Sequence, residues 1–272
     1  MLSEYIADHG EEYKREIEIK NLHGSPSERE EIIKDADIII GFIPELIAQA
    51  DKGLFEQVTN ISQRFPMAKT INKKGFGDPL GYFQPFAIVP FVIFYNPELT
   101  NELEIPRCWD DLLDVKWKGR ILMPAKEHMA PKVIRGILKH QNPKKIHRVD
   151  ENIICKGMPP NVIQAVKDGE FALGITNITF GKISTNQKIK IISLEDGFLC
   201  MPQIIAWKKG VNDNTLRLGD FLLSSKVQNF LVQQGFISVN NEDEPSETTK
   251  ISIQSIKWPG WQHFRGAMED IV

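Results

Sequence analysis

Polar or charged side chains occupy three short loops of the sequence, residues 22–27, 124–132 and 176–181, and a fourth loop, residues 41–44, offers backbone N–H groups. No loop joins an acid, a base and a nucleophile in a catalytic pattern. Hydroxyl, amide and backbone N–H groups can instead orient a small polar or anionic ligand without the cost of burying a charge. The predicted ligand contacts are His23, Gly24, Ser25, Gly41, Phe42, Lys126, Glu127, His128, Asn177 and Thr179.

Several of these residues have a second interpretation. Ser25 stands before Pro26, so it is either a helix N-cap or a ligand contact. The charges of Lys126 and Glu127 are those of an ordinary solvated loop as well as of a binding loop. His23, His128 and Glu127 allow a metal site as an alternative, but their spacing carries no zinc signature. We therefore predict a binding protein with no cofactor and no enzymatic activity.

The bulk composition narrows the class further. The 272 residues are 42% hydrophobic, which is enough to fill large cores, and the formal net charge is -3. A nucleic-acid partner is not expected, because phosphate binding needs clustered positive charge. Cys108, Cys155 and Cys200 are far apart and odd in number, so we expect free thiols. The acidic, amphipathic start is unlike a secretory leader, which leaves either a cytosolic chain or a processed one.

Alternating strand and helix patterns predict an α/β protein with a parallel or mixed sheet. Two apolar runs, residues 86–97 and 198–210, are long enough to pass from one structural unit to another. The other expected strands cover residues 16–22, 35–42 (buried on both faces), 120–124, 171–178, 188–194 and 251–256 (an edge strand). The expected helices cover residues 2–17, 26 onward, 44–58, 130–141, 161–169, two within 214–236, and one after 258, with an exposed loop at 239–250. The aromatic residues of the segment after 258 are expected to pack its helix onto a lobe.

Three segments carry a resemblance to a known family. They are "PELTNELEIPRCWDDLLDVKWKGRILMP" (97–124), "AVKDGEFALGI" (165–175) and "DFLLSSKVQNFLVQQGFISV" (220–239). In this order they resemble the type II periplasmic solute-binding proteins of ABC importers, nearest to the ferric-iron, polyamine and thiamine carriers. By this resemblance, Trp109 and Trp117 pack a short helix against one lobe.

The resemblance implies a two-lobed fold with mixed sheets, two crossing hinge strands and a ligand cleft between the lobes. Lobe I would comprise residues 1–86 and 205–272, and lobe II residues 87–204. The function implied is the solute-binding component of an ABC-type importer, which closes on its solute outside the cytoplasm and docks on a membrane permease. A cytosolic ligand-sensing domain of the same fold is the alternative.

Two departures from the family pattern matter. Family members begin with a strand before the first helix, and here that strand is absent, lost by truncation or supplied by residues 251–256; open sheet edges would then allow a strand-exchanged dimer in place of the expected monomer. In the ferric carriers a pair of tyrosines follows the strand that matches residues 171–178. Here Ile178, Thr179 and Phe180 follow it, so ferric binding by phenolates is not expected.

Overall fold

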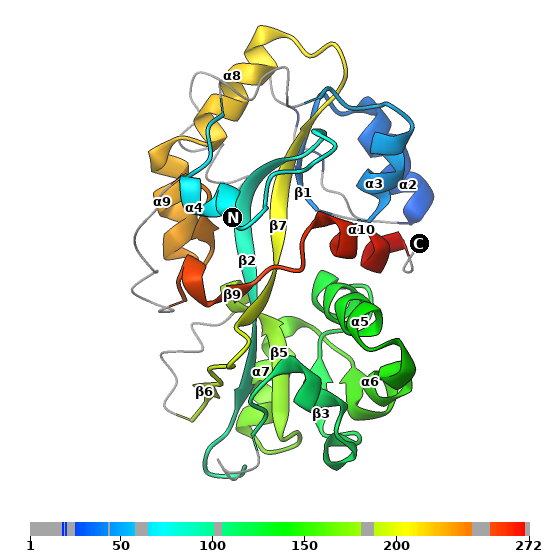
Figure 1. Cartoon of the computed structure of the whole chain (residues 1–272), viewed down its shortest axis with the longest axis vertical. Helices are drawn as coiled ribbons and strands as arrows, with labels where there is room; N and C mark the ends of the chain where they lie inside the picture. The colour runs from blue at the N-terminus through cyan, green and yellow to red at the C-terminus, as the bar shows by residue number, and fades with distance from the viewer. Residues whose placement is uncertain are drawn as a thin grey trace.

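The computed structural model describes residues 18, 20, 25–42, 44–57, 65–100, 105–180, 188–240 and 251–269. The helix expected at 2–17 lies outside the described residues, as do most of the strand expected at 16–22 and the loop expected at 239–250. His23 and Gly24 lie outside them too. Figure 1 shows two lobes, one above the other, joined by long strands at a narrow waist.

The upper lobe is built from both halves of the chain, since early and late segments lie together in it (Figure 1). Its elements are α2 (Pro26–Asp35), β1 (Ile38–Gly41), α3 (Glu45–Asp51), α4 (Lys69–Lys73), α8 (Asp213–Leu222), α9 (Ser225–Gln233) and β8 (Ile237–Ser238).

The lower lobe is built from the middle of the chain alone (Figure 1). Its elements are the 3-10 helices η4 (Trp109–Leu113), η5 (Val115–Trp117), η6 (Pro143–Lys145) and η7 (Ile178–Phe180), the helices α5 (Met129–Gln141), α6 (Ile146–Asn152) and α7 (Pro159–Lys167), and the strands β3 (Ile121–Met123), β4 (Ile153–Cys155), β5 (Leu173–Asn177) and β6 (Lys190–Ile191).

Two long strands, β2 (Gln84–Tyr95) and β7 (Phe198–Trp207), connect the lobes, which confirms the crossing strands expected from the two apolar runs. The sheet order is β1-β7-β2-β5-β3-β4, with both antiparallel and parallel pairs. β2 pairs with β7 up to Pro90 and with β5 from Phe91 onward. The change of partner falls between Pro90 and Phe91, where the strand crosses the waist, and the lobe border expected at residue 86 stays a prediction.

β1 and α3 differ from their expected forms. Only Ile39 of β1 is buried, so the strand is not covered on both faces; the partner that the described residues give it is β7, on one side. α3 ends at Asp51 instead of near residue 58, because Gly53 takes a left-handed backbone conformation with φ +75° and ends the helix.

The prediction of an edge strand at 251–256 is largely wrong. The segment forms the 3-10 helix η9 (Ile253–Ser255), and only β9 (Ile256–Lys257) is extended. Ser255 Oγ bonds back to Ser252, which favours a turn over a ladder. β9 pairs with Phe198 and Leu199 at the start of β7, whereas β1 pairs with the other end of β7. Within the described ranges, this segment therefore does not add a strand beside β1.

The tryptophans have the structural role expected for them. Trp109 and Trp117 are 0% and 1% exposed. The Trp109 indole N–H donates to the carbonyl of Gly197 over 2.9 Å, which ties the lower lobe to the residue just ahead of β7. Trp109 thereby holds one end of a crossing strand in place, and Trp117 is packed in the hydrophobic core.

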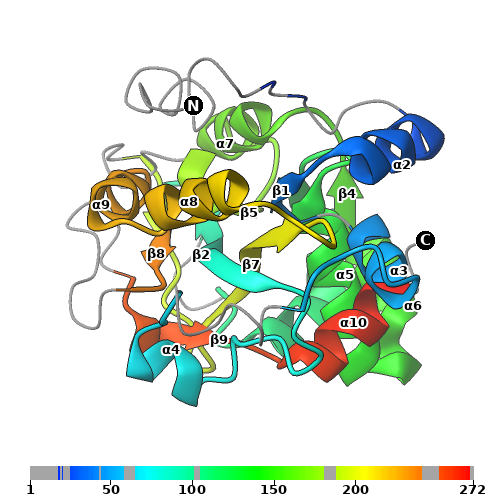
Figure 2. The ribbon, with the colours of Figure 1, turned by 90° about the horizontal axis from the view of Figure 1, so that it is seen from above.

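The C-terminal helix α10 (Trp261–Glu269) lies in the waist, against elements of both lobes (Figures 1 and 2). Sequence analysis predicted that the aromatic residues of this segment pack onto one lobe. The Phe264 ring lies 4.9 Å from the Phe42 ring of the upper lobe, and α10 packs along α5 of the lower lobe. None of the helices in the described ranges is long and apolar enough to cross a membrane.

Candidate functional site between the lobes

Asn177 and Thr179, two of the predicted ligand contacts, lie at the end of β5. Asn177 is paired with Phe91, at the point where β2 passes from one lobe to the other. The Thr179 hydroxyl donates to the Asn177 side-chain oxygen over 2.9 Å, and both side chains are partly exposed. Ile178 between them is 2% exposed and anchors the turn. An amide and a hydroxyl are thus held together at the waist, as polar contacts for a ligand require.

The loop after β3 brings the start of α5 to the same end of the lower lobe. β5 and β3 are parallel, so their carboxyl ends lie at one edge of the sheet. His128 is the N-cap of α5 and makes no side-chain hydrogen bond to the first turn, which also holds no acidic residue. The first N–H groups of a helix favour an anion or a polar oxygen, so this terminus suits a ligand group. Glu127 beside it is exposed.

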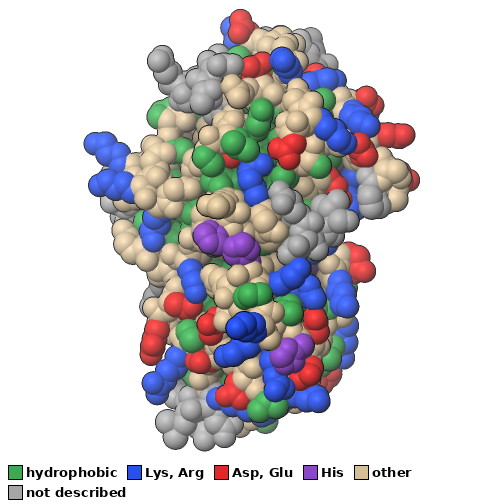
Figure 3. Space-filling view, turned by 45° about the vertical axis from the view of Figure 1, so that its right-hand side comes forward, with side chains coloured by type: hydrophobic (Ala, Val, Ile, Leu, Met, Phe, Trp, Pro, Cys, Tyr) green, Lys and Arg blue, Asp and Glu red, His purple; other side chains and the backbone are tan. Residues whose placement is uncertain are grey.

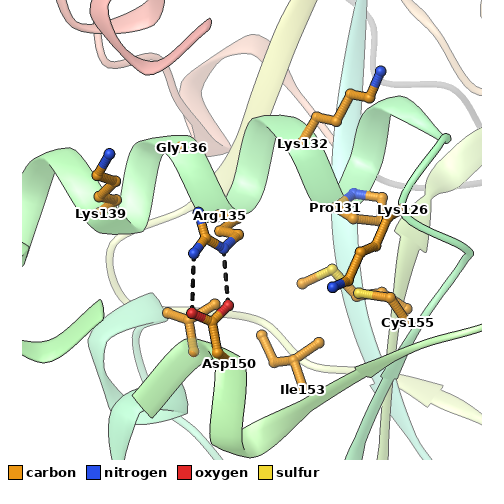
Figure 4. Close-up of a pocket in the computed structure, with 11 residues that line it drawn as sticks. Lys126, Pro131, Lys132, Arg135, Gly136, Lys139, Asp150, Ile153 and Cys155 are labelled. Carbon is orange, nitrogen blue, oxygen red and sulfur yellow. Dashed lines mark hydrogen bonds and ion pairs between the residues drawn. The ribbon is translucent and has the colours of Figure 1, made fainter. Parts of the chain in front are cut away.

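Lys126 belongs to the same loop but lies in a different environment. Figure 4 shows its side chain directed beneath α5, toward Cys155 and Asp150, in a pocket within the lower lobe. Burial raises the pKa of the Cys155 thiol, while the Lys126 ammonium acts in the opposite direction. Sequence analysis grouped Lys126 with the other ligand contacts at the waist, but its side chain lies in the pocket beneath α5.

Ser25 and Gly41, two of the ligand contacts predicted in the upper lobe, lie at the ends of secondary-structure elements. The hydroxyl of Ser25 caps α2, accepting from the N–H of Glu28 over 3.4 Å, while the Ser25 N–H donates to the Glu28 carboxylate over 2.7 Å. This capping box confirms the N-cap interpretation and leaves solute contact as a proposal. Gly41 ends β1 with φ +123°, and a side chain there would come 3.6 Å from the Gln203 side chain.

Phe42 is a core residue. It is 4% exposed, and its ring lies 6.4 Å from that of Phe83 and 4.9 Å from that of Phe264. A side chain enclosed by other aromatic rings has no surface for a solute, so the structure gives no support to Phe42 as a ligand contact.

The metal alternative has no support among the residues that the structure describes. No group of three or more His, Cys, Asp or Glu side chains in those ranges is placed to hold a metal ion. His23, one of the three residues of that alternative, lies outside the ranges. The four tyrosines of the chain stand at 5, 13, 82 and 95, so no two are adjacent.

Solved structures resemble the whole of this fold. A ferric binding protein from Campylobacter jejuni superposes with a TM-score of 0.72 at 17% identity, over 98% of this chain and 91% of that one. Iron-bound HitA from Pseudomonas aeruginosa gives 0.74 at 16% identity, over 99% and 91%. An ABC transporter structure from Clostridium perfringens gives 0.71 at 18% identity, over 100% and 95%. The fold is therefore that of the two-lobed binding proteins.

A family model gives the narrower identification. The model for bacterial extracellular solute-binding proteins matches residues 34–266. The chain belongs to this family. No curated protein matches the sequence.

Proposed function

We propose that the protein is the solute-binding component of an ABC-type importer and acts outside the cytoplasmic membrane. The observation that carries the proposal is the path of β2, which pairs with β7 in the upper lobe and with β5 in the lower lobe. A strand shared in this way lets two rigid bodies pivot around a common axis. The description of the family as extracellular favours this function over a cytosolic sensor.

The solute is a small polar or anionic molecule held between the lobes. Asn177, Thr179 and the start of α5 would contact it from the lower lobe. The loops at Ser25 and Gly41 would contact it from the upper lobe. Closure is a population shift, so the solute must interact more favourably with the closed state than with the open state. Contacts from two lobes supply that difference, because only closure brings them to the same ligand.

The cargo is not expected to be a ferric ion bound by phenolates. The proteins from Campylobacter jejuni and Pseudomonas aeruginosa are described as ferric binding and iron-bound. In this chain Ile178, Thr179 and Phe180 follow β5, and they offer one hydroxyl and no phenol. A neutral hydroxyl and an amide suit an oxygen-rich organic solute better than a bare trivalent ion.

Native mass spectrometry of the purified full chain, with metal analysis of the same sample, tests the proposal. We expect a retained small-molecule mass and no stoichiometric iron. Asn177→Ala and Thr179→Val should each weaken binding of that molecule roughly tenfold, the loss expected for a hydrogen bond to a charged group. The free energy of unfolding, measured in urea, should change little in either variant, because both side chains are partly exposed.

Gln164→Ala is the matched control, since Gln164 bonds Asp168 on the exposed side of α7. Affinity equal to wild type in both the Asn177 and the Thr179 variants would exclude the assigned contacts. Stoichiometric iron would exclude the organic solute, and chemical turnover of the retained molecule would exclude a transport protein.

A further inference from the structure

The lower lobe contains a second concave site, distinct from the waist. A cavity of about 530 Å³ lies beneath α5, between that helix, α6 and the ends of β3 and β4 (Figure 4). Of the residues predicted as ligand contacts, Lys126 alone lines it. Its volume falls within the roughly 300–1,000 Å³ of small-molecule sites in proteins.

The floor of the cavity is apolar. Met123, Val149 and Ile153 line it with exposures of 1%, 3% and 8%, so they are packed core residues. Pro131 of α5 covers part of the opposite wall. Only the edges of these side chains face the cavity, so an apolar ligand body would bury a small apolar area there and would displace the water that fills the cavity.

The rim of the cavity is cationic. Lys126, Lys132, Arg135 and Lys139 line it with a single acidic residue, Asp150, which makes the local formal charge +3 (four minus one) in a chain of net charge -3. Figure 4 shows Lys126 and Arg135 directed into the cavity, and Lys132 and Lys139 directed away from it. Figure 3 shows Lys and Arg side chains on the lower lobe interspersed with Asp and Glu, so the excess of positive charge is local to the cavity. The surrounding field therefore favours an anion.

The ion pair at the mouth can adapt to a ligand. Arg135 donates from Nε and Nη2 to the two oxygens of Asp150, each over 2.9 Å, and the side chains are 47% and 55% exposed. An exposed pair contributes little to stability, so a competing carboxylate can displace Asp150 at small cost. The hydrogen bond from Arg135 lowers the pKa of Asp150, which keeps that carboxyl ionised and the guanidinium oriented. Lys126 and Arg135 carry one positive charge each and Asp150 carries one negative charge, so the charges directed into the cavity sum to +1. This sum matches one monoanion.

We propose that this pocket binds a monocarboxylate with an apolar body. Its carboxylate would lie between Lys126 and Arg135, whose planar guanidinium suits two parallel hydrogen bonds. Its aliphatic or aromatic part would lie on Met123, Val149 and Ile153. The site is independent of the solute site at the waist.

Octanoate and octanol are suitable probes, because they share an apolar body and differ in charge. Cys155 lines the pocket and serves as its reporter, while the partly exposed Cys108 of the same lobe is an internal control. The full chain is alkylated with iodoacetamide at mildly alkaline pH, and peptide mapping follows each cysteine separately. We expect octanoate to slow alkylation of Cys155 and leave Cys108 unchanged, and octanol to have much less effect.

Variants then identify the contacts. Arg135→Gln and Lys126→Gln should each raise the octanoate concentration needed for protection roughly tenfold. Protection is compared as a ratio within each variant, because Lys126 also affects the thiol directly. Lys144→Gln, an exposed lysine of η6 that does not line the pocket, should leave protection at the wild-type level.

Three results would overturn the proposal. They are no protection by octanoate, equal protection by octanol, and protection that survives both pocket substitutions. The double variant Asn177→Ala/Thr179→Val separates this site from the waist. Protection retained in that variant supports a separate pocket, whereas protection lost there would show that octanoate acts through the waist.

Discussion

The two faces of α10 contact the two lobes in different ways. Toward the upper lobe it presents large rings and directional bonds: Trp261 donates to the carbonyl of Phe76 over 2.7 Å, and Arg265 pairs with Asp78 over 3.0 Å. Toward α5 of the lower lobe it presents small residues, so that a side chain on Gly136 would come 2.6 Å from the carbonyl oxygen of Ala267.

The two faces of α10 differ in how much movement they allow between the helix and the lobe that each contacts. Hydrogen bonds and a buried ion pair fix both distance and direction, so α10 is held to the upper lobe as one body. Close packing of small residues depends on shape alone and gives no preferred direction along the helix axis. We infer that a closing motion of the lower lobe would change the contact between α10 and α5 and leave the upper-lobe contacts intact.

The largest expected effect tests the upper-lobe face. The Asp78 side chain is fully buried, the Arg265 side chain is 11% exposed, and the guanidinium also lies 5.4 Å from the centre of the Phe83 ring. Arg265→Met should lower the free energy of unfolding by about 2–4 kcal/mol, because it removes the cation beside a buried carboxylate that then keeps only the backbone N–H donors of Leu80, Tyr82 and Phe83. Urea unfolding measures the change.

Arg148→Met is the matched control, since Arg148 pairs with Glu151 on the surface with exposures of 35% and 39%. Its cost should stay below about 1 kcal/mol. Equal costs in the two variants would show that the directional contacts do not hold α10 to the upper lobe.

An intermediate effect tests the lower-lobe face. Gly136→Ala should lower the free energy of unfolding by about 1–3 kcal/mol, because the added methyl meets a backbone carbonyl that cannot move without the whole of α10. Helix propensity alone would instead favour alanine by about 1 kcal/mol. The sign of the change in urea unfolding therefore decides between steric and intrinsic effects.

Gly266→Ala is the control on the facing helix. A side chain there would lie 3.8 Å from His140, an ordinary contact, so this change should be neutral or stabilising. Small-angle scattering should also show wider separation of the lobes in Gly136→Ala and not in Gly266→Ala. If Gly136→Ala and Gly266→Ala changed the free energy of unfolding in the same direction, close packing between α10 and α5 would be contradicted.

Local signals accounted for most of the elements that sequence analysis predicted correctly. Ser25 followed by Pro26 predicted the start of α2, and the long apolar runs predicted β2 and β7 as crossing strands. Each of these features depends on neighbouring residues or on one uninterrupted stretch. The bend at residues 251–256 was missed, because a serine turn outweighed an alternating pattern that normally indicates a strand.

The site was predicted less completely, because its features depend on contacts between distant segments. Phe42 follows a strand, as a ligand contact would, but its burial comes from Phe83 and Phe264. Lys126 lies in the expected loop, but its direction depends on the space beneath α5. The contact of α10 with both lobes was missed for the same reason, since the aromatic pattern predicts burial and does not identify the partner.

The smallest expected effect concerns the two histidines at the contact between α10 and α5. The rings of His140 and His263 meet edge to face with centroids 4.8 Å apart, and both side chains are exposed. A double-mutant cycle with His140→Ala and His263→Ala should give a coupling of about 0.5 kcal/mol, the low end of aromatic pairs, because water competes for both rings. A coupling energy above about 1.5 kcal/mol would mean that the face of α10 toward α5 also makes a strong directional contact. The lobes could then separate only by breaking the contact between His140 and His263. Both faces of α10 would then be held by directional contacts.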